Sequence, residues 1–197
     1  MGNGRVLIAG GGTGGHLFPA LAIGEEIQRR EPLTKIHYVG SIFGLEAKVF
    51  PVKDVWHTLL PMRGLQRGFG FQSFSRNVLL PSKIIKSFYK MRTLFKDFIP
   101  QIIVGTGGYA SALPLFMATR KRYSYPIVLQ EQNSFPGITT RWFASKSDAT
   151  CIAFEEANEY LKRETILTGN PVRKGIANGS KIEASKKFNL SLKNKTI

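Results

Sequence analysis

Two glycine-rich motifs in the chain have the composition of turns that bind phosphate groups. The first is GGGTGGH at residues 10–16, and the second is GTGGYAS at residues 105–111. Each follows a short apolar segment and precedes a segment with the apolar spacing of a helix. Glycines let a backbone approach a ligand closely, and the free N–H groups and dipole at a helix N-terminus favour an anion. Two such turns at one edge of a sheet predict a crevice for a diphosphate.

His16 closes the first motif and is our candidate for a general base. An isolated histidine in a sequence more often has a structural role. This one follows a predicted parallel strand, and α/β enzymes bind their ligands beyond the carboxyl ends of such strands. A neutral imidazole accepts a proton readily near pH 7, so the position favours catalysis.

The first motif also matches the dinucleotide fingerprint G-x-G-x-x-G through Gly10, Gly12 and Gly15. That fingerprint is accompanied by an acidic residue at the end of the second strand, which binds a ribose hydroxyl. The corresponding positions here are Gly40 and Ser41. We therefore expect no nicotinamide or flavin cofactor.

Two further polar motifs follow apolar segments. QEQN at residues 130–133 is out of place in a core and suits a site, although Asn133 or Ser134 as the cap of the next helix is an alternative. GNPVR occupies residues 169–173. Its Arg173 is suited to pairing with a phosphate, and the alternative is a solvated side chain.

The order of elements predicts an α/β fold. Strands are expected at residues 5–9, 36–39, 55–60, 101–104, 126–129, 149–153 and 165–167. Helices are expected at residues 17–30, 45–50, 76–98, from 108 to 122, 137–145 and 155–161. This alternation predicts a Rossmann-like open parallel sheet with helices on both faces.

The composition of the sequence changes after residue 168. We expect one domain over residues 1–168, then a linker and the start of a second domain over residues 169–197, with one helix at 182–188. Residues 195–197 resemble the first residues of a strand with nothing to pair with. The expectation is therefore a fragment of a longer protein.

The charge is strongly positive and uneven. The chain has 28 Lys and Arg against 13 Asp and Glu, a net charge of +15. Residues 61–124 contain eleven basic residues and one acidic residue, Asp97. Such a field favours nucleic acid, anionic lipid or a phosphorylated ligand, and the alternative is a solvated basic face. No run of eighteen apolar residues occurs, and the single Cys151 has no partner for an internal disulfide.

The expected helix at residues 76–98 has the composition of a helix that lies on a membrane surface. Lys83, Lys86 and Lys90 form one stripe, and an adjoining arc holds Ile84, Ile85, Phe88, Met91 and Phe95. The alternative is that the apolar arc packs on the sheet. A third alternative is that part of the apolar arc packs on the sheet, while the tip of the segment contacts lipid through Phe69, Phe71, Phe74, Leu79 and Leu80.

In order and position, the four motifs resemble those of the MurG family of glycosyltransferases, and the resemblance extends over the chain to Arg173. It implies the N-terminal, acceptor-binding domain of a GT-B fold. It also implies transfer of N-acetylglucosamine from UDP-N-acetylglucosamine to the muramoyl C4 hydroxyl of lipid I, which forms lipid II. The reaction inverts the anomeric centre without a metal, and the enzyme is peripheral on the cytoplasmic face of the membrane.

The resemblance also implies roles for single residues. His16 matches the candidate base. The donor-binding residues would be Thr13, Gly14, Gly15, Asn133 and Arg173. The acceptor-binding residues would be Gly12, His16, Gly107, Gly108, Tyr109, Ser111 and Glu131. The second glycine-rich domain of the family is absent from this chain, so turnover by the chain alone is not expected.

The expected partners are UDP-N-acetylglucosamine, lipid I and an anionic membrane surface, with no nucleic acid. One alternative is a basic module that binds nucleic acid, which has no need of paired glycine-rich loops. The other is a non-catalytic module that binds a lipid diphosphate.

Overall fold

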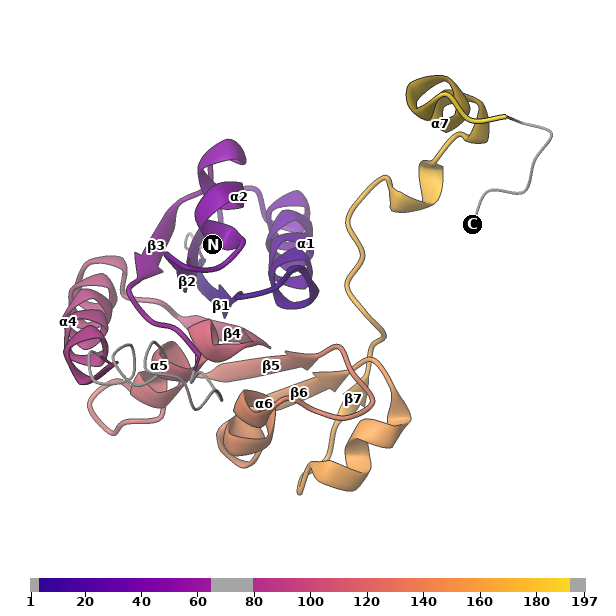
Figure 1. Cartoon of the computed structure of the whole chain (residues 1–197). Helices are drawn as coiled ribbons and strands as arrows, with labels where there is room; N and C mark the ends of the chain where they lie inside the picture. Colours follow the sequence, from indigo (N-terminus) through magenta and orange to yellow (C-terminus); the bar gives the residue numbers. More distant parts are fainter. Residues whose placement is uncertain (1–3, 65–79, 192–197) are drawn as a thin grey trace, which may run out of the picture.

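A parallel sheet of seven strands forms the centre of the structure, a computed structural model that describes residues 4–64 and 80–191 (Figure 1). Its order is β3-β2-β1-β4-β5-β6-β7, and every neighbouring pair is parallel. The strands are β1 (Arg5–Gly10), β2 (Lys35–Ser41), β3 (His57–Leu60), β4 (Ile102–Gly107), β5 (Ile127–Glu131), β6 (Ala149–Ile152) and β7 (Ile166–Leu167).

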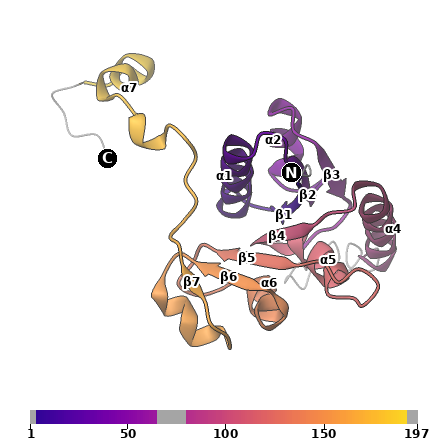
Figure 2. The same ribbon diagram turned by 180° about the vertical axis from the view of Figure 1, so that it is seen from behind.

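Helices cover both faces of the sheet. On one face lie α1 (Gly14–Arg30) and α2 (Glu46–Val52), and on the other lie α4 (Leu80–Phe98), α5 (Tyr109–Ala118) and α6 (Ile138–Phe143) (Figures 1 and 2). Short 3-10 helices are η1 (Ala144–Lys146), η2 (Glu155–Tyr160) and η3 (Ile176–Asn178), and the last helix is α7 (Lys181–Phe188). The predicted Rossmann-like architecture is confirmed.

The apolar sequence of β1 explains its central position. Val6 and Ile8 belong to the hydrophobic cluster beneath α1 and α2, whereas Leu7 and Ala9 belong to the cluster beneath α4 and α5. Successive side chains of a strand point to opposite faces, so a strand covered on both faces must be apolar at every position. This is the reason that residues 6–9 carry no polar side chain.

The chain reverses direction across the sheet between β3 and β4. It moves outward from β1 through β2 to β3, and then returns to the opposite side of β1 as β4. The loops that follow β1 and β4 therefore lead to opposite faces. We call the region outside the carboxyl ends of these two strands, where open α/β sheets bind their ligands, the β1–β4 crevice. The pairing register also shifts at the end of these strands, so that Gly10 lies opposite Gly107.

Two expected helices differ in the structure. Residues 155–161 form the 3-10 helix η2 rather than an α-helix, and α5 ends at Ala118 rather than at residue 122. The N–H groups of Tyr123 and Ser124 both donate to the carbonyl of Arg120, and Ser124 has φ 47°. This turn ends the helix before β5. The part of the expected helix at residues 76–79 lies outside the described residues.

Beyond β7 the chain leaves the sheet. The helix α7 has no buried residue and stands apart from the other helices in Figure 1. Its N-cap is Ser180, whose hydroxyl accepts a hydrogen bond from the N–H of Glu183 at 3.3 Å. The helix predicted at residues 182–188 is confirmed. The domain boundary at residues 168–169 stays a prediction, and the strand expected at residues 195–197 lies outside the described residues.

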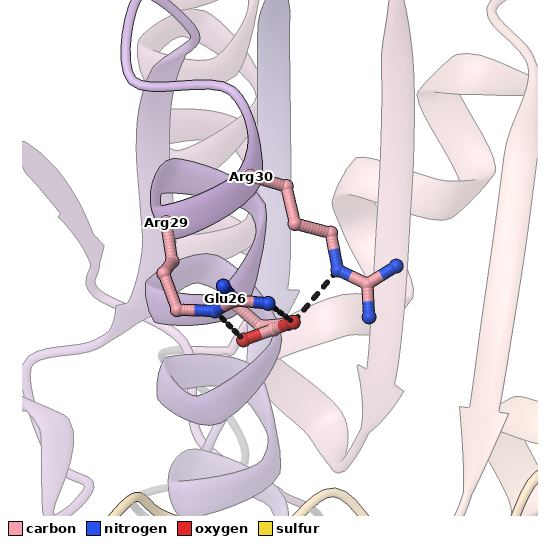
Figure 3. Close-up of polar contacts among 3 residues, drawn as sticks. All are labelled: Glu26, Arg29 and Arg30. Atoms are coloured by element: carbon pink, nitrogen blue, oxygen red, sulfur yellow. Dashed lines mark hydrogen bonds and ion pairs between the residues drawn. The ribbon is translucent and has the colours of Figure 1, made fainter.

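An ion-pair cluster lies on the solvent side of α1 near its C-terminus. Arg29 and Arg30 both donate to the carboxylate of Glu26, with N–O distances of 2.7 Å (Figure 3). The hydrogen bond from Arg29, and then the one from Arg30, lower the pKa of Glu26 to about 2. All three side chains are exposed, so solvent and salt screen the interaction and its contribution to stability is small.

His37 makes the stability of the fold depend on pH. Its Nε2 atom lies 2.9 Å from Oγ1 of Thr58, and its ring packs on Phe98 at 5.4 Å between centroids. Burial, and then the charge of His57, lower the pKa of His37 from 6.5 to about 4. The unfolded chain therefore binds a proton near pH 6.5 that the folded chain does not bind until about pH 4.

The free energy of unfolding should consequently fall as the pH is lowered from about 6.5 to about 4. The variant His37→Gln should show a smaller fall over this window, because its side chain does not titrate. Urea unfolding of both proteins at pH 4, 5.5 and 7 measures the difference. Parallel pH curves for the two proteins would contradict the prediction.

Candidate active site

The two glycine-rich loops pack against each other at the ends of β1 and β4. A Cβ atom added to Gly108, which has φ 77°, would overlap the carbonyl oxygen of Gly11. One added to Gly107, which has φ 93°, would lie 2.8 Å from Nδ1 of His16. Both glycines are therefore required by contacts within the protein.

Tyr109 joins a third segment to these loops. A Cβ atom added to Gly12 would lie 2.8 Å from Cε1 of the Tyr109 ring, and one added to Gly64 would lie 3.3 Å from Cδ1 of the same ring. The ring thus fills the space between the first glycine-rich loop and the segment that follows β3. Half-buried at the first position of α5, Tyr109 forms part of the wall of the crevice.

A buried carboxylate supports the first loop from below. Glu46 is fully buried, and its two oxygens accept the N–H of Gly12 at 2.9 and 3.1 Å. One of them also accepts the N–H of Ser41 at 2.8 Å. A Cβ atom on Gly11, Gly40 or Gly44 would overlap this side chain. The sequence analysis missed Glu46, and the glycines on either side of it were the available signal.

The N-terminus of α1 faces the same crevice. Thr13 is its exposed N-cap, and the N–H groups of His16 and Leu17 bond to the carbonyl of Thr13. Gly14 and Gly15 are the first two helical residues, and N–H groups in a first turn have no acceptor within the helix. They are available to an anionic ligand.

His16 lies between three of the four motifs. Its Nδ1 atom is 3.0 Å from the carbonyl oxygen of Thr106 and 2.9 Å from Oε1 of Gln132. The hydroxyl of Thr106 donates to the carbonyl of His16 at 2.9 Å. The imidazole is partly buried and is held by the second glycine-rich loop and the third motif.

Glu131 shapes the loop of the third motif. Its buried carboxylate accepts the N–H groups of Gln132 and Asn133 at 3.1 Å, the side-chain amide of Asn133 at 2.8 Å, and the N–H of Gly137 at 3.0 Å. Asn133 itself is exposed. The N-cap of α6 is Gly137, so the alternative that Asn133 or Ser134 caps this helix is wrong. Glu131 already bonds the N–H of Gly137 and fixes the turn that precedes the helix.

Ser111 lies beneath the second loop. It is fully buried, and its hydroxyl donates to the carbonyl of Gly108 at 2.9 Å. The hydroxyl of Thr139 donates to the same carbonyl at 3.2 Å. Ser111 therefore holds the loop in place, and its hydroxyl does not face the crevice.

The fourth motif contacts α1 and the loop of the third motif. The guanidinium of Arg173 stacks on the ring of Phe18 in α1, 4.1 Å from its centroid. The side-chain amide of Asn170 donates to the carbonyl of Gln132 at 3.3 Å. Arg173 is exposed, and its guanidinium lies beside the first turns of α1.

Two cations, Arg63 of the basic run and Lys83 of the predicted membrane-facing stripe, meet at the ring of Phe43. The guanidinium of Arg63 and the ammonium of Lys83 lie 3.8 and 5.2 Å from the centroid of the Phe43 ring. The segment that carries Arg63 is fixed by a 2.6 Å hydrogen bond from the hydroxyl of Ser41 to the carbonyl of Met62. These residues come from three separate stretches of chain, so sequence spacing gave no sign of their proximity.

The described residues contain no group of three His, Cys, Asp or Glu side chains arranged to bind a metal ion. Within the same ranges, no helix has the length and apolar character needed to cross a membrane.

Comparison with known proteins gives a consistent result. The N-terminal domain of glycosyltransferase family 28 matches residues 6–152. A relative from Alkaliphilus metalliredigens is 38% identical over 195 residues, which are 98% of this chain and 52% of that protein. A relative from Chlorobaculum tepidum is 39% identical over 86% of this chain and 46% of its own length. Both are named UDP-N-acetylglucosamine–N-acetylmuramyl-(pentapeptide) pyrophosphoryl-undecaprenol N-acetylglucosamine transferase.

Solved structures show the same fold. Acinetobacter baumannii MurG matches with a TM-score of 0.67 at 22% identity, over 88% of this chain and 47% of that one. A glycosyltransferase from Rickettsia africae matches with a TM-score of 0.56 at 11% identity, over 98% and 51% of the two chains. The predicted N-terminal domain of a GT-B fold is confirmed. The chain spans about half the length of the curated relatives that it matches.

Glu46 should be necessary for the first loop and for stability. Glu46→Ala removes the acceptor of two buried N–H groups and leaves a cavity, and should lower the free energy of unfolding by about 2–4 kcal/mol. Glu46→Gln keeps the volume and one acceptor oxygen and should cost less. The exposed Glu159→Ala should stay within about 0.5 kcal/mol of the wild type. Chemical denaturation measures all three, and an equal effect of Glu46→Ala and Glu159→Ala would contradict the assignment.

Proposed function

Because the chain belongs to glycosyltransferase family 28, of which it contains the N-terminal domain, we propose that it forms the acceptor-binding half of the enzyme named by its curated relatives. The enzyme transfers N-acetylglucosamine from UDP-N-acetylglucosamine to lipid I, the undecaprenyl-diphosphate-linked muramoyl pentapeptide, and forms lipid II. The observation that carries the proposal is the convergence of the first three motifs at His16. The fourth motif is attached to the third through Asn170 and to α1 through Arg173.

The diphosphate of the acceptor binds at the second loop. The N-terminus of α5, at Gly108 and Tyr109, supplies N–H groups, with Gly107 and Gly12 lining the same place. Arg63 immediately precedes Gly64, which lies against the Tyr109 ring, and Lys83 shares the Phe43 ring with Arg63. Both cations add positive charge near this wall. Ser111 and Glu131 contribute indirectly, because their polar atoms already hold the two loops.

The donor lies against the N-terminus of α1. Thr13, Gly14 and Gly15 form this end of the helix, Arg173 is stacked beside it, and Asn133 is exposed on the neighbouring loop. Most contacts to the nucleotide and the stabilisation of the UDP leaving group come from the other half of the enzyme. The chain therefore supplies one wall of the cleft.

The chemical step needs a base at the acceptor hydroxyl. His16 accepts the proton of the muramoyl C4 hydroxyl while the oxygen of that hydroxyl forms a bond to the anomeric carbon of N-acetylglucosamine. The bond from that carbon to the diphosphate oxygen breaks, and the electron pair leaves with UDP. Attack from the opposite face inverts the anomeric centre.

The helix α4 supports attachment to a membrane surface. Met91 and Phe95 are buried in the core, whereas Ile84, Ile85 and Phe88 of the same predicted arc are 41%, 56% and 38% exposed. Lys83, Lys86 and Lys90 lie on the same helix. This division favours peripheral binding to anionic lipid at the cytoplasmic face. The proposed lipid-facing tip at Phe69, Phe71, Phe74 and Leu79, and the side chain of Leu80, lie outside the described residues.

In the full-length enzyme, His16→Ala should reduce kcat by roughly 100-fold or more, because a positioned base contributes about that much. His57→Gln is a matched control and should leave kcat near normal, since His57 lies at the amino end of the edge strand β3, whereas His16 lies beyond the carboxyl end of β1. A near-normal rate in His16→Ala would remove His16 from the chemistry.

The division between acceptor and donor is testable on this chain alone. Titration calorimetry should detect binding of a short-chain lipid I analogue and little or no binding of UDP-N-acetylglucosamine. Tyr109→Ala should weaken acceptor binding about tenfold or more, because the ring forms the crevice wall. Tight donor binding without acceptor binding would overturn this division.

Membrane attachment should depend on both apolar and basic residues of α4. The double variant Ile84→Ser/Ile85→Ser should bind vesicles containing phosphatidylglycerol about tenfold or more weakly. Val52→Ser, on α2 at the other face of the sheet and 87% exposed, is the control and should bind normally. Binding should also weaken with added salt. Vesicle binding that is insensitive to salt and to anionic lipid would refute the model.

A further inference from the structure

The neighbours of Gln132 permit only one orientation of its side-chain amide. Its Nε2 atom lies 2.9 Å from the carbonyl oxygen of Thr106 and 3.0 Å from that of Gln130, and it also donates to Oε1 of Gln130. All three neighbours are acceptors, so a flipped amide would place an oxygen against three oxygens. Gln130 is itself fixed, because its Nε2 donates to the carbonyl of Glu131 at 3.1 Å. The oxygen of the Gln132 amide must therefore face His16.

This orientation determines which nitrogen of His16 carries the proton. Nδ1 lies 2.9 Å from Oε1 of Gln132 and 3.0 Å from the carbonyl oxygen of Thr106. Neither oxygen has a proton to donate. A neutral imidazole with its lone pair on Nδ1 would point that pair at two oxygens, whereas a proton on Nδ1 is shared between them.

The neutral ring consequently has its lone pair on Nε2. Among the residues that the structure describes, no hydrogen bond occupies this atom. Free histidine in water prefers the opposite tautomer, with the proton on Nε2, and that form cannot act as a base through Nε2. The protein environment thus reverses the intrinsic preference of the side chain.

We propose that Gln132 is a positioning residue that holds His16 in the Nδ1–H tautomer and so makes Nε2 the atom that receives the acceptor proton. The catalytic part of this inference rests on the proposed transferase function, but the tautomer does not. When Nε2 gains the proton from the hydroxyl, the charge of the imidazolium is stabilised by the same two oxygens through Nδ1–H. The proton then passes from Nε2 to solvent after UDP has left.

Nitrogen-15 NMR of this chain reads the tautomer without any turnover. The chain has three histidines, and the long-range couplings of each ring distinguish a protonated from an unprotonated nitrogen. In the wild type, at a pH at which the ring is neutral, Nδ1 of His16 should be protonated and Nε2 unprotonated. His57 is an internal reference, because its Nδ1 lies 2.8 Å from the carbonyl of Val55 and should also be protonated. A protonated Nε2 in His16 would overturn the proposal.

Two variants separate the role of the amide oxygen from a general effect on folding. Gln132→Met has a similar length and no acceptor, and should raise the population of the Nε2–H tautomer of His16 while the His57 signals stay unchanged. Gln132→Glu retains an oxygen acceptor for Nδ1–H and should keep Nδ1 protonated. Its second oxygen replaces the Nε2 donor that faces three acceptors, so its free energy of unfolding is measured beside the NMR spectrum. If Gln132→Met leaves the tautomer of His16 unaltered, the carbonyl of Thr106 is sufficient and Gln132 is not the positioning residue.

Kinetics of the full-length enzyme complete the test. Gln132→Met should lower kcat about tenfold or more and leave the KM for both substrates within about threefold. The reason is that the wrong tautomer of His16 impairs proton transfer and not substrate binding. A raised KM at unchanged kcat would assign Gln132 to binding and overturn the positioning role. If His16→Ala remains active while the NMR result holds, the base assignment fails and the tautomer assignment stands, so the two failures are distinguishable.

Discussion

The approach of two backbones at the ends of β1 and β4 is the constraint on which the rest of the site depends. Gly108 lies so close to the carbonyl of Gly11 that no side chain fits between them. This contact lies at the switch point of the sheet, where the loops after β1 and β4 lead to opposite faces. It brings the N-termini of α1 and α5 to one crevice and holds the ring of His16 against the second loop. Much of the glycine content near these loops is therefore explained by the space that Glu46, Tyr109 and His16 occupy.

The fold was predictable from the sequence because its signals are local. An apolar run such as residues 5–9, followed by glycines and a helical pattern, identifies a buried parallel strand without any knowledge of its neighbours. The errors occurred where local pattern is weak, as in the short 3-10 helix η2 and the turn that ends α5 at Ala118. The four motifs were also local, and the topology of a parallel sheet implies that they meet.

The supporting residues of the site were not predictable in the same way. Glu46 is separated from Gly12 by 34 positions and Gln132 from His16 by 116, and the contacts exist only after folding. Arg63, Phe43 and Lys83 likewise meet through tertiary packing. Ser111 and Glu131 were identified as site residues from their motifs, and their hydrogen bonds assign them to the frame beneath it. A motif indicates that a residue belongs to a site, and only coordinates separate contact from support.

The linker after β7 has a mechanical consequence. Asn170 is bonded to the loop of the third motif, and Arg173 is stacked on α1, so the segment after β7 contacts the domain at these two residues. Any swing of α7 relative to the sheet must begin beyond this attachment. The first residue there with left-handed backbone geometry is Gly175, at φ 92°. A change of direction at Gly175 would leave the contacts of Asn170 and Arg173 with the domain in place.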